Sequence, residues 1–425
     1  MEFFGTFWAL VPPLVAIILA LITKETYISL FVGIVVGGFL VAGFQPVAAL
    51  DQIVNTGLVP AVADNAGIFV FLVILGIFVC LIGMSGAAAA FGNWAAKHIH
   101  SRVGSLIATF IFSLLIFIDD YFACLTVGNV MNPVTDKYRV SRAKLAYVID
   151  ATAAPIRMIA PVSSWAAAVS GTADDLGVNG LQLFVDAIPF NFYSLMTLVF
   201  LVGLVIMAFD YGPMAKAELE AIRNGELGTI GVSETRSVPR ARIIDMVIPI
   251  LVLIATCVLG MLYVGGFFGV DAWGDTAFEG DFIGAFGNTD AFIALPWGGL
   301  IALVITFIYL WLRRVVSFKE SLTSIVKGFE GMLPAILILT FACSLKNLTG
   351  ELGAAEFVAE LMTGAAPALF MMLPAIIFLV AGGLAFATGT SWGTFGILIP
   401  VVLPVFASEP TLQIIGISAC LAGAV

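Results

Sequence analysis

The composition of the chain excludes a water-soluble protein. It has 425 residues, of which 61% are hydrophobic and 11% are charged, too little polar surface to cover a core of this size. Apolar stretches of about 20 residues, long enough to cross a bilayer as helices, recur from end to end. The net charge of −10 matters less than the distribution of Lys and Arg, which sets orientation. We therefore expect an all-α polytopic membrane protein.

The loop charges predict which side of the membrane each loop occupies. Segments with Asp or Glu but no Lys or Arg are placed outside: 45–66, 171–186 and 267–290. Segments rich in Lys and Arg are placed in the cytoplasm: 93–103, 131–144, 210–242 and 313–330. The N-terminus is accordingly expected outside.

The first predicted spans, in chain order, are 3–22, 28–44 and 67–91. The next apolar stretch, 104–130, has basic loops at both ends, so a single crossing would place one of those loops outside. We expect a re-entrant hairpin instead, whose first arm is residues 104–118. At about 1.5 Å per residue this arm is roughly 22 Å long, too short to span the membrane. Asp119 and Asp120 would then lie at the hairpin tip.

The later predicted spans are 145–170, 187–209, 243–266, 291–312 and 331–349. The stretch 366–406 that follows them has loops without Lys or Arg at both ends. Gly, Thr and Ser interrupt it at residues 387–396, ATGTSWGTFG. We therefore expect a second re-entrant hairpin, entered from the opposite face of the membrane.

This order of elements predicts an inverted-topology repeat with two re-entrant hairpins and discontinuous helices. The expected units are a first repeat, 1–209, with hairpin 104–130 and linking span 187–209, a cytoplasmic linker, 210–242, and a second repeat, 243–425, with hairpin 366–406. Broken elements at corresponding positions of the two halves are typical of a transporter whose site lies near the bilayer midplane.

The adjacent acids Asp119 and Asp120 are the first candidates for an ion site. An acid at the bilayer centre costs at least about 2.5 kcal/mol unless it faces protein, water or a cation. A carboxylate in such a place can hold a proton or a cation, but not both, which is the minimum requirement for exchange. The alternative is that the pair ends a helix near the membrane surface.

A second group of candidates lies in LAYVIDATAAPIRMIAPVSSW, residues 145–165. It contains one acid, Asp150, and two prolines, Pro155 and Pro161, which free backbone carbonyls. Hydroxyl oxygens come from Thr152, Ser163 and Ser164. Such an oxygen set suits Na⁺, and we expect the ion at Asp119, Asp120 and Asp150. For the serines, ordinary hydrogen bonding between helices is the alternative.

Two further features concern the same site. Arg157 either pairs with one of these acids or lies nearer the cytoplasm, where its side chain reaches toward the membrane surface. The second hairpin tip offers neutral oxygens from Thr388, Thr390 and Ser391 beside permissive glycines. The two tips would bring acids from one side and hydroxyls from the other.

One short motif points to an enzyme. Gly83, Ser85 and Gly86 have the Gly-x-Ser-Gly form used by intramembrane serine proteases. Such an enzyme needs a base at membrane depth, whereas His98 and His100 lie in a predicted cytoplasmic loop. We therefore treat the motif as a remote alternative and expect a secondary transporter rather than an enzyme.

Several motifs resemble those of the NhaC-type sodium/proton antiporter family. They are VPPLVAIILALIT at 11–23, DDYFACLTVGNVMNPVTDKYRVSRAKLAYVIDATAAPI at 119–156, APVSSWAA at 160–167, IPFNFY at 188–193 and ATGTSWGTFGILIPVVLP at 387–404. The resemblance implies sodium/proton antiport in a bacterial inner membrane. It assigns polar positions to Asp119, Asp120, Asp136, Asp150, Thr152, Ser163, Ser164, Thr390 and Ser391. Supporting residues are expected to be Arg157, Asn129, Asp136, Trp165 and Trp392.

The resemblance also bears on ligands and on completeness. The expected partners are Na⁺, H⁺ and the lipid bilayer, with no cofactor and no nucleic acid, and a homodimer is considered. Similar sequences are also assigned to coupled exchange of small organic acids or amino acids. Family members continue beyond the last helix, whereas this chain stops within the apolar segment ISACLAGAV. We therefore expect it to be truncated at its C-terminus.

Overall fold

The architecture comes from a computed structural model, which is helical and holds no β-strand in the part of the chain that it describes. The described residues are 3–117, 120–163, 165–166, 169, 173, 179–228, 237–271, 274, 276, 278–354, 357, 367–388, 391–407 and 409–425. Only the backbone is described for residues 120–122, 125–126, 129, 283, 287, 291, 367–370, 387–388 and 392–393.

The first half of the chain contains spans, short helices and one helical hairpin. In order, its elements are η1 (Phe7–Leu10), α1 (Val11–Thr23), α2 (Thr26–Val41), α3 (Pro46–Asp51), the π-helix η2 (Gln52–Leu58), α4 (Val59–Asp64), α5 (Ala66–Ser85), α6 (Ala87–His98), α7 (Arg102–Leu115), α8 (Asp120–Asp136), α9 (Arg142–Arg157), α11 (Gly180–Ala187), η4 (Ile188–Phe190) and α12 (Phe192–Met207). The arms of the hairpin are α7 and α8.

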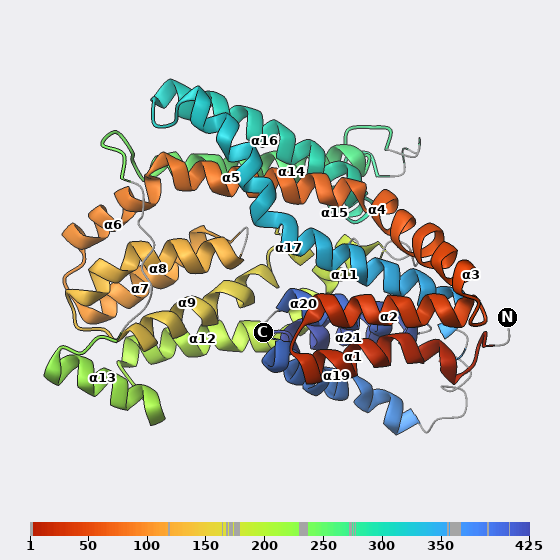
Figure 1. Ribbon diagram of the computed structural model, residues 1–425. Coiled ribbons are helices and arrows are strands. Elements are labelled where there is room, and N and C mark those ends of the chain that lie inside the picture. Colours follow the sequence, from red (N-terminus) through yellow and green to blue (C-terminus); the bar gives the residue numbers. More distant parts are fainter. Residues whose placement is uncertain are drawn as a thin grey trace.

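The linker and the second half follow a similar order. Their elements are α13 (Gly212–Asn224) in the linker, then α14 (Ile244–Val264), α15 (Phe282–Gly287), α16 (Ala291–Arg313), α17 (Phe318–Glu351), α19 (Pro367–Thr388), α20 (Ser391–Val405) and α21 (Pro410–Gly423). The long helices α14, α16 and α17 precede a second hairpin, α19–α20, just as α1, α2 and α5 precede the first. In Figure 1, α7 runs from the left end toward the middle of the molecule, whereas α19 runs from the right end toward the middle.

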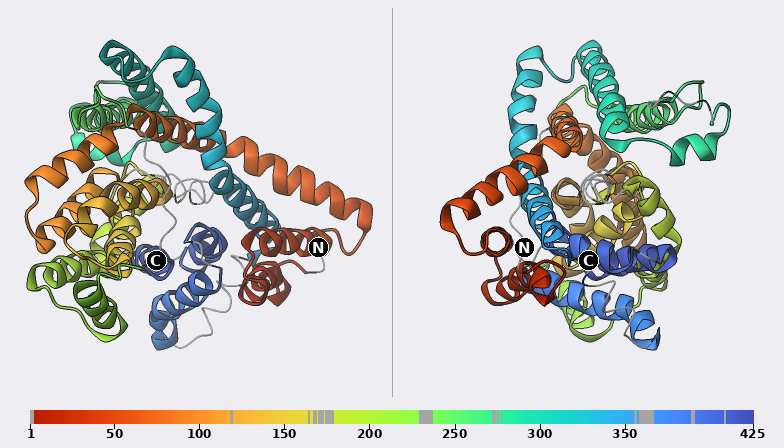
Figure 2. Two further views of the ribbon diagram at one scale, coloured as in Figure 1. Left: turned by 60° about the vertical axis from the view of Figure 1, so that its left-hand side comes forward. Right: turned by 90° about the vertical axis from the view of Figure 1, so that its right-hand side faces the viewer.

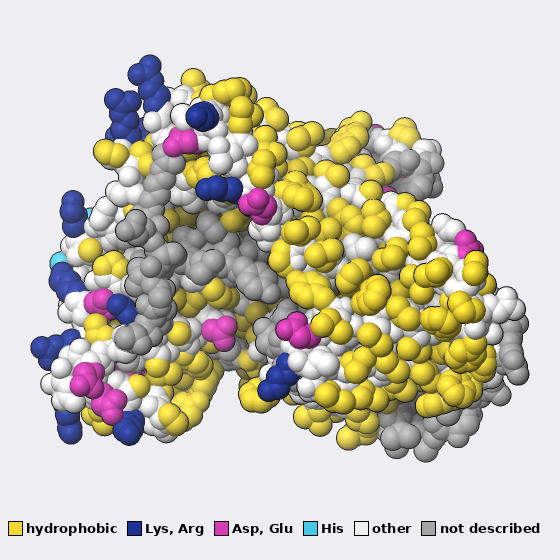
Figure 3. Space-filling model, viewed as in Figure 1, with side chains coloured by type: hydrophobic (Ala, Val, Ile, Leu, Met, Phe, Trp, Pro, Cys, Tyr) yellow, Lys and Arg dark blue, Asp and Glu magenta, His cyan; other side chains and the backbone are white. Residues whose placement is uncertain are grey.

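The structure confirms a membrane protein with two opposed hairpins. Five helical stretches among the described residues are long and apolar enough to cross a membrane: Ala66–Ser85, Phe192–Asn224, Ile244–Val264, Phe292–Arg313 and Phe318–Glu351. Figure 3 shows Lys and Arg gathered at the left end, over α6, α7, α13 and the turn between α16 and α17. The rest of this face is mostly hydrophobic, as expected of a surface in contact with lipid.

Several boundaries differ from the sequence prediction for local reasons. The span predicted to reach residue 91 ends at Ser85, because Gly86 has a left-handed conformation (φ +75°) and α6 starts a new direction. Helix α17 begins well before residue 331 because Ser317 and Glu320 form a capping box. The segment 45–66, expected as an outer loop, is helical almost throughout.

The longest helix, α17, holds two parts of the molecule together. Its 34 residues are roughly 51 Å long and pack on α5 at one end and on α2 and η2 toward the other. Where α5 and α17 cross, Gly76 faces Gly328, and a Cβ atom on Gly328 would lie 2.3 Å from the Ile77 nitrogen. The backbones therefore touch, as they do at small-residue crossings in membranes. Figure 2 shows α14 and α16 standing beside this pair, away from α19, α20 and α21.

Candidate ion-binding site

The first hairpin has the form that the loop charges predict, although its second arm extends to Asp136 rather than to residue 130. Helices α7 and α8 pack against each other, and the chain between them, 116–119, is not helical where it is described. The 14 residues of α7 are roughly 21 Å long, too short to span the membrane. Asp119 lies outside the described residues, and Asp120 begins α8, although its side chain is not described.

A buried arginine holds the end of the first arm. Arg157, the last residue of α9, is 0% exposed, which excludes a side chain that reaches toward the membrane surface. Its Nη2 donates to the carbonyl of Ile116, one residue beyond α7, and its Nη1 donates to the carbonyl of Ala153 in its own helix. The guanidinium is therefore fixed beside the break that precedes Asp119 and Asp120, the position expected for a partner of those acids.

The other candidates on α9 occupy different environments. Thr152 is fully buried, and its hydroxyl donates within its own helix to the carbonyls of Val148, at 2.7 Å, and Ile149, at 2.9 Å. Asp150 is exposed in the structure, two residues away and therefore on another face of the helix. Because the Thr152 hydroxyl proton is donated to these carbonyls, a bound cation could be coordinated only by the lone pairs of Thr152 Oγ1.

Beyond α9 the chain unwinds around Pro161, whereas Pro155 lies inside the helix. Residues 158–163 are not helical, and Ser163 Oγ donates to the carbonyl of Arg157 and accepts from the amide of Ala166, both at 3.2 Å. Trp165 is fully buried, and the centroid of its ring lies 5.0 Å from the centroid of the Phe395 ring in α20. The chain directly after the unwound segment therefore packs against the second arm of the second hairpin. Ser164 lies outside the described residues.

The second hairpin matches its predicted range closely, because α19 ends at Thr388 and α20 begins at Ser391. Ser391 begins α20 and is half-buried, whereas Thr390 lies outside the described residues. The side chains of Thr388, Trp392 and, in the first hairpin, Asn129 are also not described. The structure thus places the helix ends that flank both tips, and the expected meeting of acids and hydroxyls stays a prediction.

Asp136 is separated from the tip by the length of its own helix. It ends α8, roughly 24 Å from Asp120, where its carboxylate pairs with Arg142, with one oxygen 2.7 Å from Nη2. Arg142 also donates to Asn132, at 2.9 Å. These contacts hold the end of α8 that lies away from Asp120, and a supporting role of Asp136 in the site stays a prediction.

Sequence reasoning missed a buried polar bridge at the end of α9. Asn191, at the break between η4 and α12, is 0% exposed; its amide donates to the Met158 carbonyl, at 3.0 Å, and its oxygen accepts from Ser418 of α21, at 2.6 Å. Ser194 donates to the sulfur of Met158, at 3.0 Å. The one signal in the sequence was the single Asn between apolar runs in IPFNFY. A polar side chain buried in a membrane protein needs a hydrogen-bond partner, so this Asn could have been expected to have one. The bridge joins the unwound end of α9 to the second half.

Ser85, the centre of the serine-protease-like motif, has a structural role. Its Oγ donates to the Ile82 carbonyl, at 2.7 Å, and accepts from the Ala87 amide, at 3.1 Å. These bonds stabilise the junction between α5 and α6, where Gly86 turns the chain. The hydroxyl thus hydrogen-bonds to backbone groups at the ends of two helices, a common role of Ser at such positions.

Two opposed hairpins, an unwound helix between them and a fully buried arginine define the class as a secondary transporter, not an enzyme. The chain belongs to the Na⁺/H⁺ antiporter family, whose model matches residues 174–424. An uncharacterized protein of Haemophilus influenzae is 34% identical over 437 residues, which cover 100% of this chain and 82% of that protein.

Two solved structures have a similar fold. The YdaH transporter of Alcanivorax borkumensis has a TM-score of 0.53 and 14% identity, covering 88% of this chain and 77% of that one. MtrF of Neisseria gonorrhoeae has a TM-score of 0.51 and 12% identity, covering 88% of this chain and 74% of that one. At these identities the likeness concerns the fold alone.

Proposed function

We propose that this chain exchanges Na⁺ for H⁺ across the bacterial inner membrane, with Asp119 and Asp120 as the groups that alternately bind proton and cation. The observation that supports this most directly is the buried guanidinium of Arg157 beside the break of the first hairpin. A buried positive charge lowers the cost of an ionised carboxylate near it. Membership of the Na⁺/H⁺ antiporter family supports the choice of ions.

The wider site would be completed by elements that meet near the break. Ser163 lies in the unwound segment beyond Arg157, and Trp165 joins that segment to α20 of the second hairpin. Unwound carbonyls and hydroxyls supply the neutral oxygens that Na⁺ prefers. Asp150, Thr152, Ser164, Thr388, Thr390 and Ser391 remain the proposed further ligands.

The charge distribution supports an orientation for this exchange. Lys and Arg gather at one end of the molecule, over α6, α7, α13 and the α16–α17 turn (Figure 3), and loops of this kind stay in the cytoplasm. In this orientation the N-terminus lies outside, the first hairpin enters from the cytoplasm and the second enters from the outside.

The test uses the protein in sealed vesicles that hold a pH gradient. We expect added Na⁺ to dissipate the gradient, with Li⁺ and K⁺ compared in parallel. Asp119→Asn and Asp120→Asn should abolish the response at unchanged expression, whereas Asp51→Asn, at an exposed acid bonded to Asn55, should not. Full activity in both hairpin variants would remove the proposed role of the pair.

A second function, Na⁺- or H⁺-coupled exchange of a small organic acid or amino acid, is favoured by one observation. Arg157 is a fully buried cation within the membrane-embedded part, where it would attract an anionic substrate. MtrF, which shares the fold, is described as illuminating a class of antimetabolite efflux pumps. Inhibition of the vesicle response by unlabelled carboxylates or amino acids would favour this function over plain ion exchange.

A further inference from the structure

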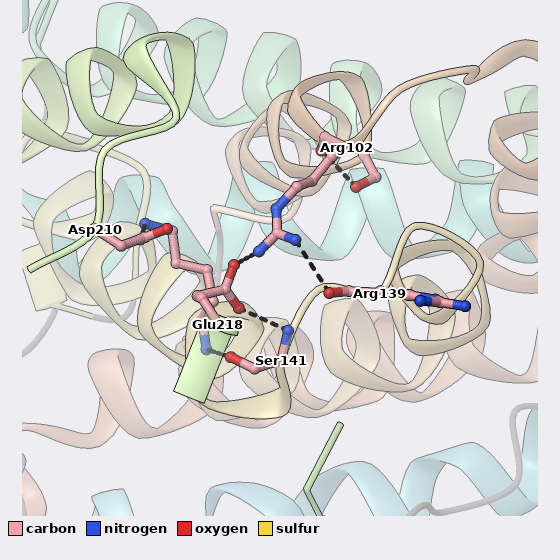
Figure 4. A network of polar contacts seen from close by, with 7 residues as sticks. Arg102, Arg139, Ser141, Asp210 and Glu218 are labelled. Atoms are coloured by element: carbon pink, nitrogen blue, oxygen red, sulfur yellow. Dashed lines mark hydrogen bonds and ion pairs between the residues drawn. The ribbon is translucent and has the colours of Figure 1, made fainter. Parts of the chain in front are cut away.

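The linker between the two halves does more than connect them, because its helix α13 lies on the cytoplasmic base of the first hairpin. The helix spans Gly212–Asn224 and ends where Gly225 has a left-handed conformation (φ +74°). Its outer face is open to the surroundings: the side chains of Lys216 and Glu220 are 81% and 47% exposed. Glu218, on the same helix, is only 3% exposed and points toward the hairpin base (Figure 4).

The carboxylate of Glu218 binds the start of the hairpin and the turn that follows it. Its Oε2 pairs with the guanidinium of Arg102, the first residue of α7. Its Oε1 accepts from the amide of Ser141, at 2.7 Å, in the turn between α8 and α9. Arg102 in turn donates to the carbonyl of Arg139, at 3.1 Å, which closes the network drawn in Figure 4. One side chain of the linker thus joins the start of the first arm to the turn after the second arm.

Neighbouring contacts hold the linker in the same place. Arg139 donates to the Ile222 carbonyl of α13, at 2.8 Å, and the Arg142 amide donates to the Leu227 carbonyl, at 2.7 Å. Before α13, Asp210 pairs with Lys144 of α9, whose side chain is 4% exposed. The acids Asp210 and Glu218 of the linker therefore neutralise two of the basic residues that mark this end as cytoplasmic.

The far end of the same hairpin is held by a different residue. Arg157 binds the Ile116 carbonyl at the end of α7, roughly 21 Å from Arg102 along the helix. A helix of this length transmits a displacement of its base to its tip, because its internal hydrogen bonds keep it rigid. The hairpin is thus fixed at the base by the linker and at the tip by α9.

We propose that Glu218 is a positioning residue for transport: by holding the base of the α7–α8 hairpin, it sets the position of the tip and hence the affinity for the transported cation. This inference rests on the proposed function, because it takes the tip as the ion site. Removing Glu218 takes the nearest carboxylate away from the guanidinium of Arg102, whose side chain is 24% exposed, and leaves the Ser141 amide without its acceptor. Both losses favour local opening of the base.

The first test measures opening of the base without transport. Val140, between Arg139 and Ser141, is 1% exposed, so a Val140→Cys thiol should react slowly with a maleimide. We expect Glu218→Ala to raise the labelling rate on the order of tenfold, because labelling follows the local opening equilibrium. Glu220→Ala removes the same charge from the exposed face of α13 and should leave the rate unchanged. The chain without Val140→Cys measures labelling of the native thiols.

The second test measures transport in vesicles. Glu218→Ala should raise the KM for Na⁺ about tenfold while kcat changes less than about twofold, because a displaced tip weakens binding. Glu218→Gln, which can still accept from Ser141, should show a smaller rise in KM. The charge-swapped double variant, Arg102→Glu with Glu218→Arg, should restore the wild-type KM for Na⁺ and the slow labelling rate. A merely structural residue would lower the amount of folded protein without changing KM.

The results separate this inference from the proposed function. Unchanged labelling in Glu218→Ala, or faster labelling with an unchanged KM, would overturn the positioning role. A wild-type protein without any response to Na⁺ would refute the proposed function instead. The labelling comparison would then still decide whether Glu218 holds the hairpin base.

Discussion

The crossing of α5 and α17 allows a sharp test of how these helices pack. A Cβ atom on Gly328 would lie 2.3 Å from the nitrogen and 2.5 Å from the Cα of Ile77, and 2.6 Å from the carbonyl carbon of Gly76. All three are backbone atoms, which cannot rotate away as a side chain can. Gly331, on the same helix, has no heavy atom within 4 Å of its Cβ position. The variants Gly328→Ala and Gly331→Ala therefore differ in one respect, the space around the added methyl group.

The expected magnitudes follow from two opposing effects. In a helix interior, Gly→Ala gains about 1 kcal/mol at either position, because alanine loses less backbone entropy. At Gly328 the added methyl requires the helices to separate by about 1 Å, since carbon atoms pack at roughly 3.5–4.0 Å. Overpacking of this kind costs about 1–3 kcal/mol or more. The two variants should thus differ by about 1–3 kcal/mol, with Gly331→Ala the more stable.

The assay is thermal unfolding of both variants in the same detergent, followed by intrinsic fluorescence. We expect Gly328→Ala to melt several degrees below Gly331→Ala, and Gly331→Ala to melt at or slightly above wild type. Gly76→Ala should behave like Gly328→Ala, because its Cβ would lie 2.2 Å from the Gly328 carbonyl oxygen. Equal melting temperatures for the Gly328 and Gly331 variants would refute backbone contact at this crossing.

Three further predictions concern the candidate site. Arg157→Lys should reduce Na⁺-driven exchange at least about tenfold at unchanged expression, because one ammonium cannot reproduce the forked guanidinium contacts, and activity within about twofold of wild type would contradict this. Asn191→Ala should cost about 1–3 kcal/mol of stability, more than Ser418→Ala, because it leaves two partners unsatisfied; the reverse order of melting temperatures would count against the bridge. Trp165→Ala should lower the melting temperature more than Trp165→Phe, which keeps a ring against Phe395, and equal losses would argue against that contact.

The sequence alone determined the membrane class and the two hairpins. Lys and Arg at both ends of 104–130 could not be placed on opposite sides, and this required the break that the structure shows between α7 and α8. The same reasoning from loops without basic residues located α19 and α20. The helix starts after Ser101, Ser141 and Ser317 depend on local sequence too, because each serine caps the helix that follows it, but the predicted spans did not use these caps and began later.

Charge patterns were less informative about the structure of loops. The acidic segments were assigned to a side, but acidity does not distinguish a coil from a helix, so the helices within 45–66 and the buried α11 were missed. In α11, Leu181 and Phe184 are buried in the fold. This tertiary packing stabilises a short helix that the local sequence does not predict.

Contacts between residues far apart in the chain were decided by the tertiary structure alone. Asn191 and Ser418 are bonded across 227 positions, and Ser141 and Glu218 across 77. The local sequence around each residue does not indicate its partner, because packing of the helices decides which segments come close enough to form a hydrogen bond. The direction of the Arg157 side chain was undecided for the same reason. The composition showed that this part of the chain lies in the membrane. That Arg157 binds the Ile116 carbonyl depends on the positions of α7 and α9.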